Sequence, residues 1–140
     1  MIVVFDASTF VSAALKPDSV SEQALLLAID NPNRLILSSD VETEYREVIF
    51  RPKFDRFISR ERRQHILDIV LFAADRVEPM ERVRECRDPK DDKYLALAAA
   101  GDADVIVSSD ARHLLSMHPW RGISILSPAD FLARADEVIE

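Results

Sequence analysis

The chain has 140 residues, 48% of them hydrophobic and 31% charged, and Cys86 is its only cysteine, so a core must form without disulfides or a cysteine-bound metal. The net charge of −7 excludes a protein that coats nucleic acid by bulk attraction, and no apolar segment approaches the roughly 20 residues that a membrane helix needs. We therefore expect one cytoplasmic domain that spans residues 1–140.

Four short apolar runs, the first at residues 2–5, are typical of strands buried on both faces of a parallel sheet. The others are 35–37, 105–107 and 123–126, and residues 77–79 leave room for a short additional strand. Helical patterns lie between these runs, and this alternation predicts an α/β layered fold with a parallel sheet of four to five strands. The predicted helices cover residues 9–15, 21–29, 41–50, 61–74, 91–100 and 129–139.

Three helix starts carry recognisable cap sequences. Ser39 with Glu42 three residues later matches a capping box. Ser127 and Asp88 are each followed directly by proline, which combines a cap with proline at the first helical position.

Acidic residues follow three of the predicted strands. Asp6 follows the first strand directly, and Asp40 and Asp110 each follow a strand and two serines. In an open parallel sheet the ligand crevice lies beyond the carboxyl ends of the strands, so all three acids are expected at that edge. Asp6 and Asp110 have a simpler explanation as caps of the helices that follow. The sequence places no lysine or histidine at these strand ends to neutralise the acids.

Glu44 falls inside the apolar stripe of the predicted 41–50 helix, three residues after Val41 and four before Val48. An ionised carboxylate on a core face is costly unless it is paired or binds a cation. We therefore expect Glu44 to point inward, toward either a cation or a buried arginine.

Asp91 and Asp92 are rival candidates at the start of the Ala-rich helix. Asp91 shares a helix face with Tyr94 and Leu95 and is preferred for that reason. A register one residue later selects Asp92 instead, and acids at this position also stabilise the helix amides without any further role.

Four carboxylates from distant parts of the chain, Asp6, Glu44, Asp91 and Asp110, are thus each predicted near one edge of the sheet. A cluster of this kind needs a hard cation, and Mg²⁺ or Mn²⁺ held by carboxylates and waters is the usual solution. The chemistry available to such a site is hydrolysis of a phosphodiester by activated water.

The combination resembles the PIN domain family, and within it the VapC group of bacterial toxins. It is carried by Asp6 after an N-terminal strand, Glu44 in ETEYREVIFRPKF, the acids of DPKDDKYLALAAAGDADVIVSSD and the closing Asp110. The resemblance covers almost the whole chain and implies a three-layer α/β/α PIN-like nuclease domain. It further implies a metal-dependent endoribonuclease, the toxin of a toxin–antitoxin pair, whose metal is held by Asp6, Glu44, Asp91 and Asp110.

In that comparison Ser108 assists the acids by hydrogen bonds. Family members commonly carry Thr and Asn after the first Asp, whereas Ala7 and Ser8 follow Asp6 here, although Ser8 can still donate to a carboxylate. The family often has Asn where Asp92 stands, which leaves Asp92 open as an alternative metal ligand.

Three other functions fit the sequence less well. A phosphohydrolase of the haloacid dehalogenase class needs a second acid two residues after Asp6, where Ser8 stands. A receiver domain needs a lysine at a late strand end, and none follows Val107 or Leu126. A catalytically inactive PIN-like module that binds RNA or a protein partner is the remaining alternative, although such a module has no need of Glu44 on an apolar face.

A basic stretch, residues 46–63, carries seven Lys and Arg against three acids, a local charge of +4 in an acidic chain. Arginine suits bidentate phosphate contacts, so we expect this stretch to form or border an RNA track. A solvated helix face is the simpler explanation. The residues expected to bind RNA are Arg46, Arg51, Lys53 and Arg56.

The predicted 61–74 and 129–139 helices carry more apolar residues than one buried stripe needs. Together with the family resemblance, this surplus predicts a homodimer and an inhibitory antitoxin partner. The alternative is that both helices are sandwiched within the monomer. The residues concerned are Ile66, Leu67, Ile69, Val70, Leu71, Phe72 and Ala73 in the first helix, and Phe131, Leu132, Val138 and Ile139 in the second.

Overall fold

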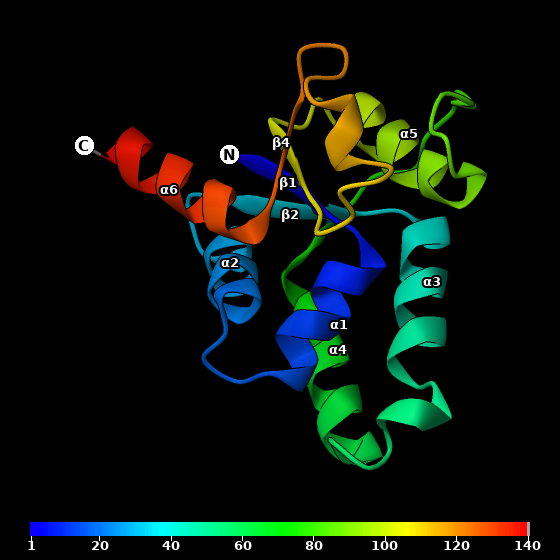
Figure 1. The fold of residues 1–140 in the computed structure, drawn as a ribbon, viewed down its shortest axis with the longest axis vertical. Coiled ribbons are helices and arrows are strands. Elements are labelled where there is room, and N and C mark those ends of the chain that lie inside the picture. Colours follow the sequence, from blue (N-terminus) through cyan, green and yellow to red (C-terminus); the bar gives the residue numbers. More distant parts are fainter. Residues whose placement is uncertain (140) are drawn as a thin grey trace.

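The computed structural model describes residues 1–139 and contains a sheet of five strands, all paired in parallel (Figure 1). The order across the sheet is β3-β2-β1-β4-β5, so β1 lies at the centre and the chain leaves it in opposite directions on its two sides. The α/β fold with a parallel sheet is therefore confirmed. The strands are β1 (Ile2–Phe5), β2 (Arg34–Leu37), β3 (Asp75–Arg76), β4 (Val105–Val107) and β5 (Ser124–Leu126).

Helices cover both faces of the sheet, which gives three layers. In Figure 1, α1 and α2 lie on one side of the strands and α5 lies on the other. No helix among residues 1–139 is long and apolar enough to cross a membrane. The helices are α1 (Ala7–Leu15), α2 (Val20–Ile29), α3 (Ser39–Ile49), α4 (Arg60–Ala73), α5 (Asp92–Ala100) and α6 (Pro128–Ile139), with short 3₁₀ turns η1 (Pro52–Phe54), η2 (Pro89–Asp91) and η3 (Leu115–Met117).

The central strand is buried from Val3 to Phe5, as its apolar run predicts. Val3, Val4 and Phe5 have no exposed surface, because helices pack against both faces of β1. The register pairs Phe5 with Val107 of β4, so the two strands end side by side. The residues that follow β1 and β4 are consequently neighbours at one edge of the sheet.

The edge strand and one cap differ from the prediction. The additional strand, β3, begins at Asp75, two residues before the predicted 77–79 segment, although the Val77 amide still donates to the Leu37 carbonyl at 2.8 Å. The capping box is wrong: α3 begins at Ser39, so Ser38 is its cap and accepts from the Val41 amide at 3.2 Å.

The other predicted caps are present. Ser127 accepts from the Asp130 amide at 3.1 Å and begins α6. Asp88 accepts from the Lys90 amide at 3.0 Å, but it caps the 3₁₀ turn η2, and α5 begins only at Asp92.

Helix α4 leaves part of its surplus apolar surface open. Leu67 and Val70 are buried, whereas Ile69 is 44% and Phe72 93% exposed, so α4 is not sandwiched within the monomer. On α6, Phe131 is buried and Leu132 half-buried. The side chains of Val138 and Ile139 lie outside the described part of the chain.

Candidate active site

The four predicted acids line one pocket at the carboxyl ends of β1 and β4. The pocket has a volume of about 260 Å³, and α1, α3, η2 and α5 contribute to its wall. Asp40 does not reach it and lies instead in a neighbouring pocket of about 510 Å³. The acid pocket is lined by Asp6, Ala7, Ser8, Glu44, Val48, Arg51, Asp88, Lys90, Asp91, Tyr94, Asp110 and His113.

Asp6 is buried and held from three directions. Its Oδ1 atom accepts from the Thr9 amide at 2.9 Å, which caps α1, and from the Ser8 hydroxyl at 3.3 Å. Its Oδ2 atom accepts from the buried Ser108 hydroxyl at 2.5 Å. Burial raises the pKa of Asp6 despite these hydrogen bonds. The residue is therefore both a helix cap and a fixed wall of the pocket.

Ser108 connects two of the acids. Besides donating to Asp6, its Oγ atom accepts from the Asp110 amide at 3.0 Å, which fixes the turn that follows β4. Ser108 itself has no exposed surface. The serine thus sets the spacing between the two strand ends that carry Asp6 and Asp110.

Glu44 points from α3 toward α5, where two side chains contact it. The Tyr94 hydroxyl donates to Oε1, and the Lys93 ammonium donates to Oε2. The Tyr94 hydroxyl also accepts from the Ala7 amide at 3.0 Å, so it links Glu44 to the start of α1. The expected compensating charge is present, but it is supplied by Lys93 of α5 rather than by a buried arginine.

Burial also acts on Tyr94. It raises the pKa of the hydroxyl well above its usual range, and the adjacent Glu44 carboxylate raises it further. Tyr94 is therefore a permanent hydrogen-bond donor to Glu44.

The neighbouring acids Asp91 and Asp92 point to different places. Asp91 lines the acid pocket, whereas Asp92 Oδ1 accepts from the Cys86 amide at 2.7 Å and the Glu85 amide at 3.1 Å. Burial raises the pKa of Asp91 to about 6, and the charges of nearby Asp88, Asp6, Asp110 and Glu44 add to that shift. Asp91 thus reports an excess of negative charge in the pocket, while Asp92 holds a loop.

Asp110 is paired with a histidine that the sequence does not place at this site. Its Oδ2 atom lies 2.6 Å from His113 Nδ1, and its Oδ1 atom accepts from the Arg112 and His113 amides at 3.0 and 3.3 Å. Burial acts to raise the pKa of Asp110, but the hydrogen bonds from His113 and the Arg112 amide outweigh it and lower that pKa. The expectation that no lysine or histidine neutralises the acids is wrong, because the Lys93 ammonium forms an ion pair with Glu44, and the His113 ring contacts Asp110.

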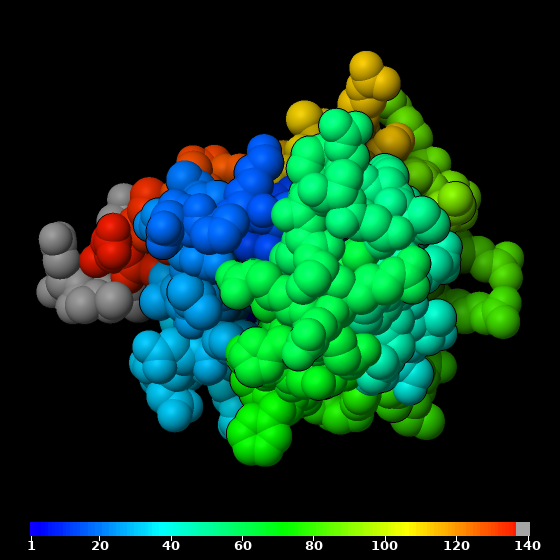
Figure 2. All heavy atoms as spheres, turned by 90° about the horizontal axis from the view of Figure 1, so that it is seen from below, coloured from blue at the N-terminus to red at the C-terminus, as the bar shows by residue number. Residues whose placement is uncertain are grey.

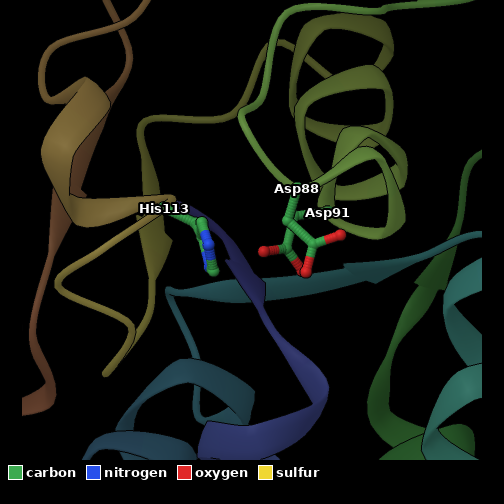
Figure 3. Close-up of side chains that lie close together, drawn as sticks. All are labelled: Asp88, Asp91 and His113. Carbon is green, nitrogen blue, oxygen red and sulfur yellow. The ribbon is translucent and has the colours of Figure 1, made fainter.

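Asp88 and His113 are site residues that sequence reasoning missed. Together with Asp91 they offer ligand atoms that all lie within 4.8 Å of one another, and Figure 3 shows the two carboxylates beside the imidazole. Spacing offered a signal for both, because Asp88 stands three residues before Asp91 and His113 three residues after Asp110. Asp88, which precedes a proline, is expected only as a helix cap, and the sequence predicts no role for His113.

A model of the PIN domain family matches residues 2–112. The chain belongs to the PIN domain family, a family of nucleases. No curated protein matches the sequence. Among solved structures, a chain in the crystal structure of VapBC2 from Rickettsia felis, bound to a DNA fragment from their promoter, has a similar fold. The TM-score is 0.58 at 17% identity, and the alignment covers 89% of this chain and 97% of that chain.

The acid pocket of this PIN domain suits a hard divalent cation. Five carboxylates border a small volume, and the negative charges of the other four add to the effect of burial in raising the pKa of Asp91. A cation with oxygen ligands relieves the repulsion among these charges, and carboxylates are the ligands that Mg²⁺ and Mn²⁺ prefer. The residues of the pocket therefore fit the divalent metal ion that the family resemblance implies.

A basic arm, residues 50–58, follows directly after α3 of the PIN domain. Arg51 lines the pocket, whereas Lys53 and Arg56 are exposed farther along the arm. Arg46 lies on another face of α3, where its Nε donates to Glu42 at 3.0 Å. Of the predicted RNA-binding residues, Arg51, Lys53 and Arg56 therefore lie on the arm. Arg46 lies apart from it.

One member of the basic stretch cannot contact RNA. Arg63 has no exposed surface and donates to the Ile49 carbonyl at 3.0 Å and to Asp55 at 2.6 Å. It also donates to the Arg51 carbonyl at 3.4 Å. The expectation that the whole 46–63 stretch borders the RNA is wrong for Arg63, which fastens the arm to α4.

Proposed function

We propose that this PIN domain is a metal-dependent endoribonuclease that hydrolyses RNA phosphodiesters. Asp6, Glu44, Asp91 and Asp110 would hold Mg²⁺ or Mn²⁺, with Asp92 serving the adjacent loop. The convergence of these four acids in one pocket, where burial and the neighbouring negative charges together raise the pKa of Asp91 to about 6, is the observation that carries the proposal.

The bound cation would stabilise the negative charge that develops on the phosphoryl group during hydrolysis. The chain's own part is to hold the acids in place. Ser8 and Ser108 orient Asp6, and Tyr94 orients Glu44 while it anchors the start of α1. Arg51, at the rim of the same pocket, supplies a guanidinium for a neighbouring phosphate.

The biological setting we propose is a toxin–antitoxin pair. The structural neighbour comes from a VapBC2 complex, and the family resemblance points to the same group of toxins. Exposed Ile69 and Phe72 on α4 give the chain an apolar face suited to a homodimer or an antitoxin. Light scattering tests the dimer: a mass that stays near 15.9 kDa on concentrating excludes a stable one.

Cleavage of a labelled RNA with Mg²⁺, with Mn²⁺ and with excess EDTA tests the proposed activity. We expect cleavage with either cation and none in EDTA. Asp40→Asn is the matched control, because Asp40 is exposed and lies outside the acid pocket. An intact RNA under all three conditions would overturn the proposal.

One observation favours a second candidate, a catalytically inactive PIN-like module that binds RNA or a protein partner. Lys93 already forms an ion pair with Glu44, and His113 contacts Asp110, so the charge of Glu44 is offset without a cation. RNA binding without cleavage in the assay above would identify this alternative.

A further inference from the structure

The basic arm presents one aromatic side chain to solvent. Phe57 is 67% exposed, while Ile58 beside it is buried and Phe54 is half-buried. The guanidinium carbon of Arg56 lies 5.2 Å from the centre of the Phe57 ring, and the Lys53 ammonium lies 5.1 Å from the centre of the Phe54 ring. An apolar ring and positive charges therefore alternate on one exposed surface.

The exposed ring is held on a fixed turn. The Phe57 and Ile58 amides donate to the Phe54 carbonyl at 3.0 and 3.2 Å. Buried Arg63 fastens the arm to α4, because it binds both the Ile49 carbonyl at the end of α3 and the side chain of Asp55 within the arm. The backbone that carries Phe57 is thus held in a hydrogen-bonded turn, which limits the backbone entropy lost when a ligand packs against the ring.

A continuous surface leads from the acid pocket to the arm. Glu44, Val48 and Arg51 recur at helical spacing along one side of α3 and its end, and all three line the pocket. The arm follows directly, and Figure 2 shows its residues facing the viewer beside those of α1. A chain of phosphates that reaches the acids along α3 must therefore pass the arm.

We propose that Phe57 stacks on an unpaired base of RNA while Arg56 binds the adjacent phosphate. The inference rests on the proposed nuclease function and deepens it, because it names a base-stacking residue and a phosphate-binding residue outside the acid pocket. Every base has a face that stacks on an aromatic ring, but a base inside a duplex is already stacked on its neighbours. A protein partner that covered Phe57 would also have to desolvate the Arg56 and Lys53 charges, which a phosphate chain instead neutralises.

Fluorescence anisotropy in EDTA, which separates binding from cleavage, tests the inference. The probes are a short labelled oligoadenylate and an RNA duplex of the same length. Phe57→Ala should weaken binding of the single strand by at least about five-fold and leave duplex binding unchanged. Leu26→Ala is the control, because Leu26 is an exposed apolar residue on α2 that belongs to neither the acid pocket nor the basic arm, and its loss should change neither affinity.

Salt dependence separates the two roles. Phe57→Ala should lower the single-strand affinity without changing its slope against salt, because the ring contacts no phosphate. Arg56→Gln should flatten the slope by roughly 0.7, the value for one phosphate contact with a single strand. Phe57→Trp should bind the single strand about as tightly as the wild type does, unlike Phe57→Ala. Oligoadenylate should quench the fluorescence of the new tryptophan, a signal that the wild type lacks because its single tryptophan is Trp120.

The outcomes distinguish this inference from the proposed function. If the wild type cleaves RNA with a cation but Phe57→Ala binds oligoadenylate as tightly as the wild type, the stacking role is wrong and the nuclease proposal stands. If Phe57→Ala weakens duplex and single strand equally, or changes only the mass measured by light scattering, the ring is not a base platform. If the wild type neither binds nor cleaves RNA, both proposals fail.

Discussion

The acid pocket and the basic arm lie next to each other but are built in opposite ways. The pocket is negative, and its key side chains are buried at strand ends and fixed by internal hydrogen bonds, as Asp6 and Ser108 are. The arm is positive, and its charges are exposed, whereas the residue that fastens it to α4, Arg63, is buried. The pocket thus repels phosphate until a cation binds, while the arm attracts phosphate at all times. Binding and cleavage of RNA should therefore be separable.

The largest effect is expected in the pocket. Asp6→Asn should reduce cleavage by about 100-fold or more, because the proposed cation loses a central ligand. RNA binding in EDTA should be unchanged or slightly stronger, since a negative charge beside the phosphate path is removed. Parallel cleavage and anisotropy assays measure the two quantities. A variant that loses RNA binding together with cleavage would show that the two regions do not act separately.

The next largest effect is expected where the arm joins α4. Arg63→Met should lower the free energy of unfolding by about 3 kcal/mol, because it leaves the Ile49 carbonyl and Asp55 without their buried partner. Urea unfolding measures this loss. Arg60→Gln is the control, since Arg60 also pairs with Asp55 but is 64% exposed, and its loss should cost no more than about 0.5 kcal/mol. Equal effects would contradict the structural role of Arg63.

Charge on the arm should set the salt dependence of RNA binding. Replacing Arg51, Lys53 and Arg56 together with Gln should flatten the salt slope for single-stranded RNA by about 2, at roughly 0.7 for each contact. Affinity for Mn²⁺ should stay the same, because none of the three is a proposed ligand. An unchanged slope would assign these charges to a solvated surface or to an acidic protein partner.

The smallest effect concerns stability without metal. Because the pKa of Asp91 is raised to about 6 in the folded protein, the ionised carboxylate destabilises the fold. Stability should therefore fall as pH rises from about 4 to about 6, as far as Asp91 contributes, and remain low above that range. Asp91→Asn should remove this dependence and raise the Tm at pH 7 in EDTA.

Asp110→Asn is the matched contrast for Asp91→Asn. The pKa of Asp110 is lowered, so its ionised form stabilises the fold, and its loss should lower the Tm. Thermal melts of both variants across this pH range measure whether Asp91→Asn raises the Tm and Asp110→Asn lowers it. Equal shifts in one direction would show that the two acids do not differ in environment as the structure indicates.

Elements defined by local pattern were predictable from the sequence, and partners across the fold were not. The buried strands at residues 2–5 and 105–107 have the predicted bounds, because apolar β-branched runs are local signals. The contact of Lys93 with Glu44 joins α5 to α3, and nothing in either segment alone reveals it.

Arg63 shows where the same reasoning could have gone further. It stands four residues before Leu67 and seven before Val70, inside the buried stripe of α4, just as Glu44 stands inside the stripe of α3. The net charge of residues 46–63 treats Arg63 like its exposed neighbours, although its place in the apolar stripe of α4 predicts that it is buried. A charged residue in an apolar stripe thus indicates burial for either sign of charge.

Calorimetric titration of Mn²⁺ into the wild type, Asp6→Asn and Asp40→Asn tests most directly whether the acid pocket is a metal site. We expect saturable binding to the wild type and to Asp40→Asn, and binding to Asp6→Asn that is weaker by about 10-fold or more because a ligand is lost. Equal affinities for the wild type and Asp6→Asn, or no binding to the wild type, would contradict the proposed metal site.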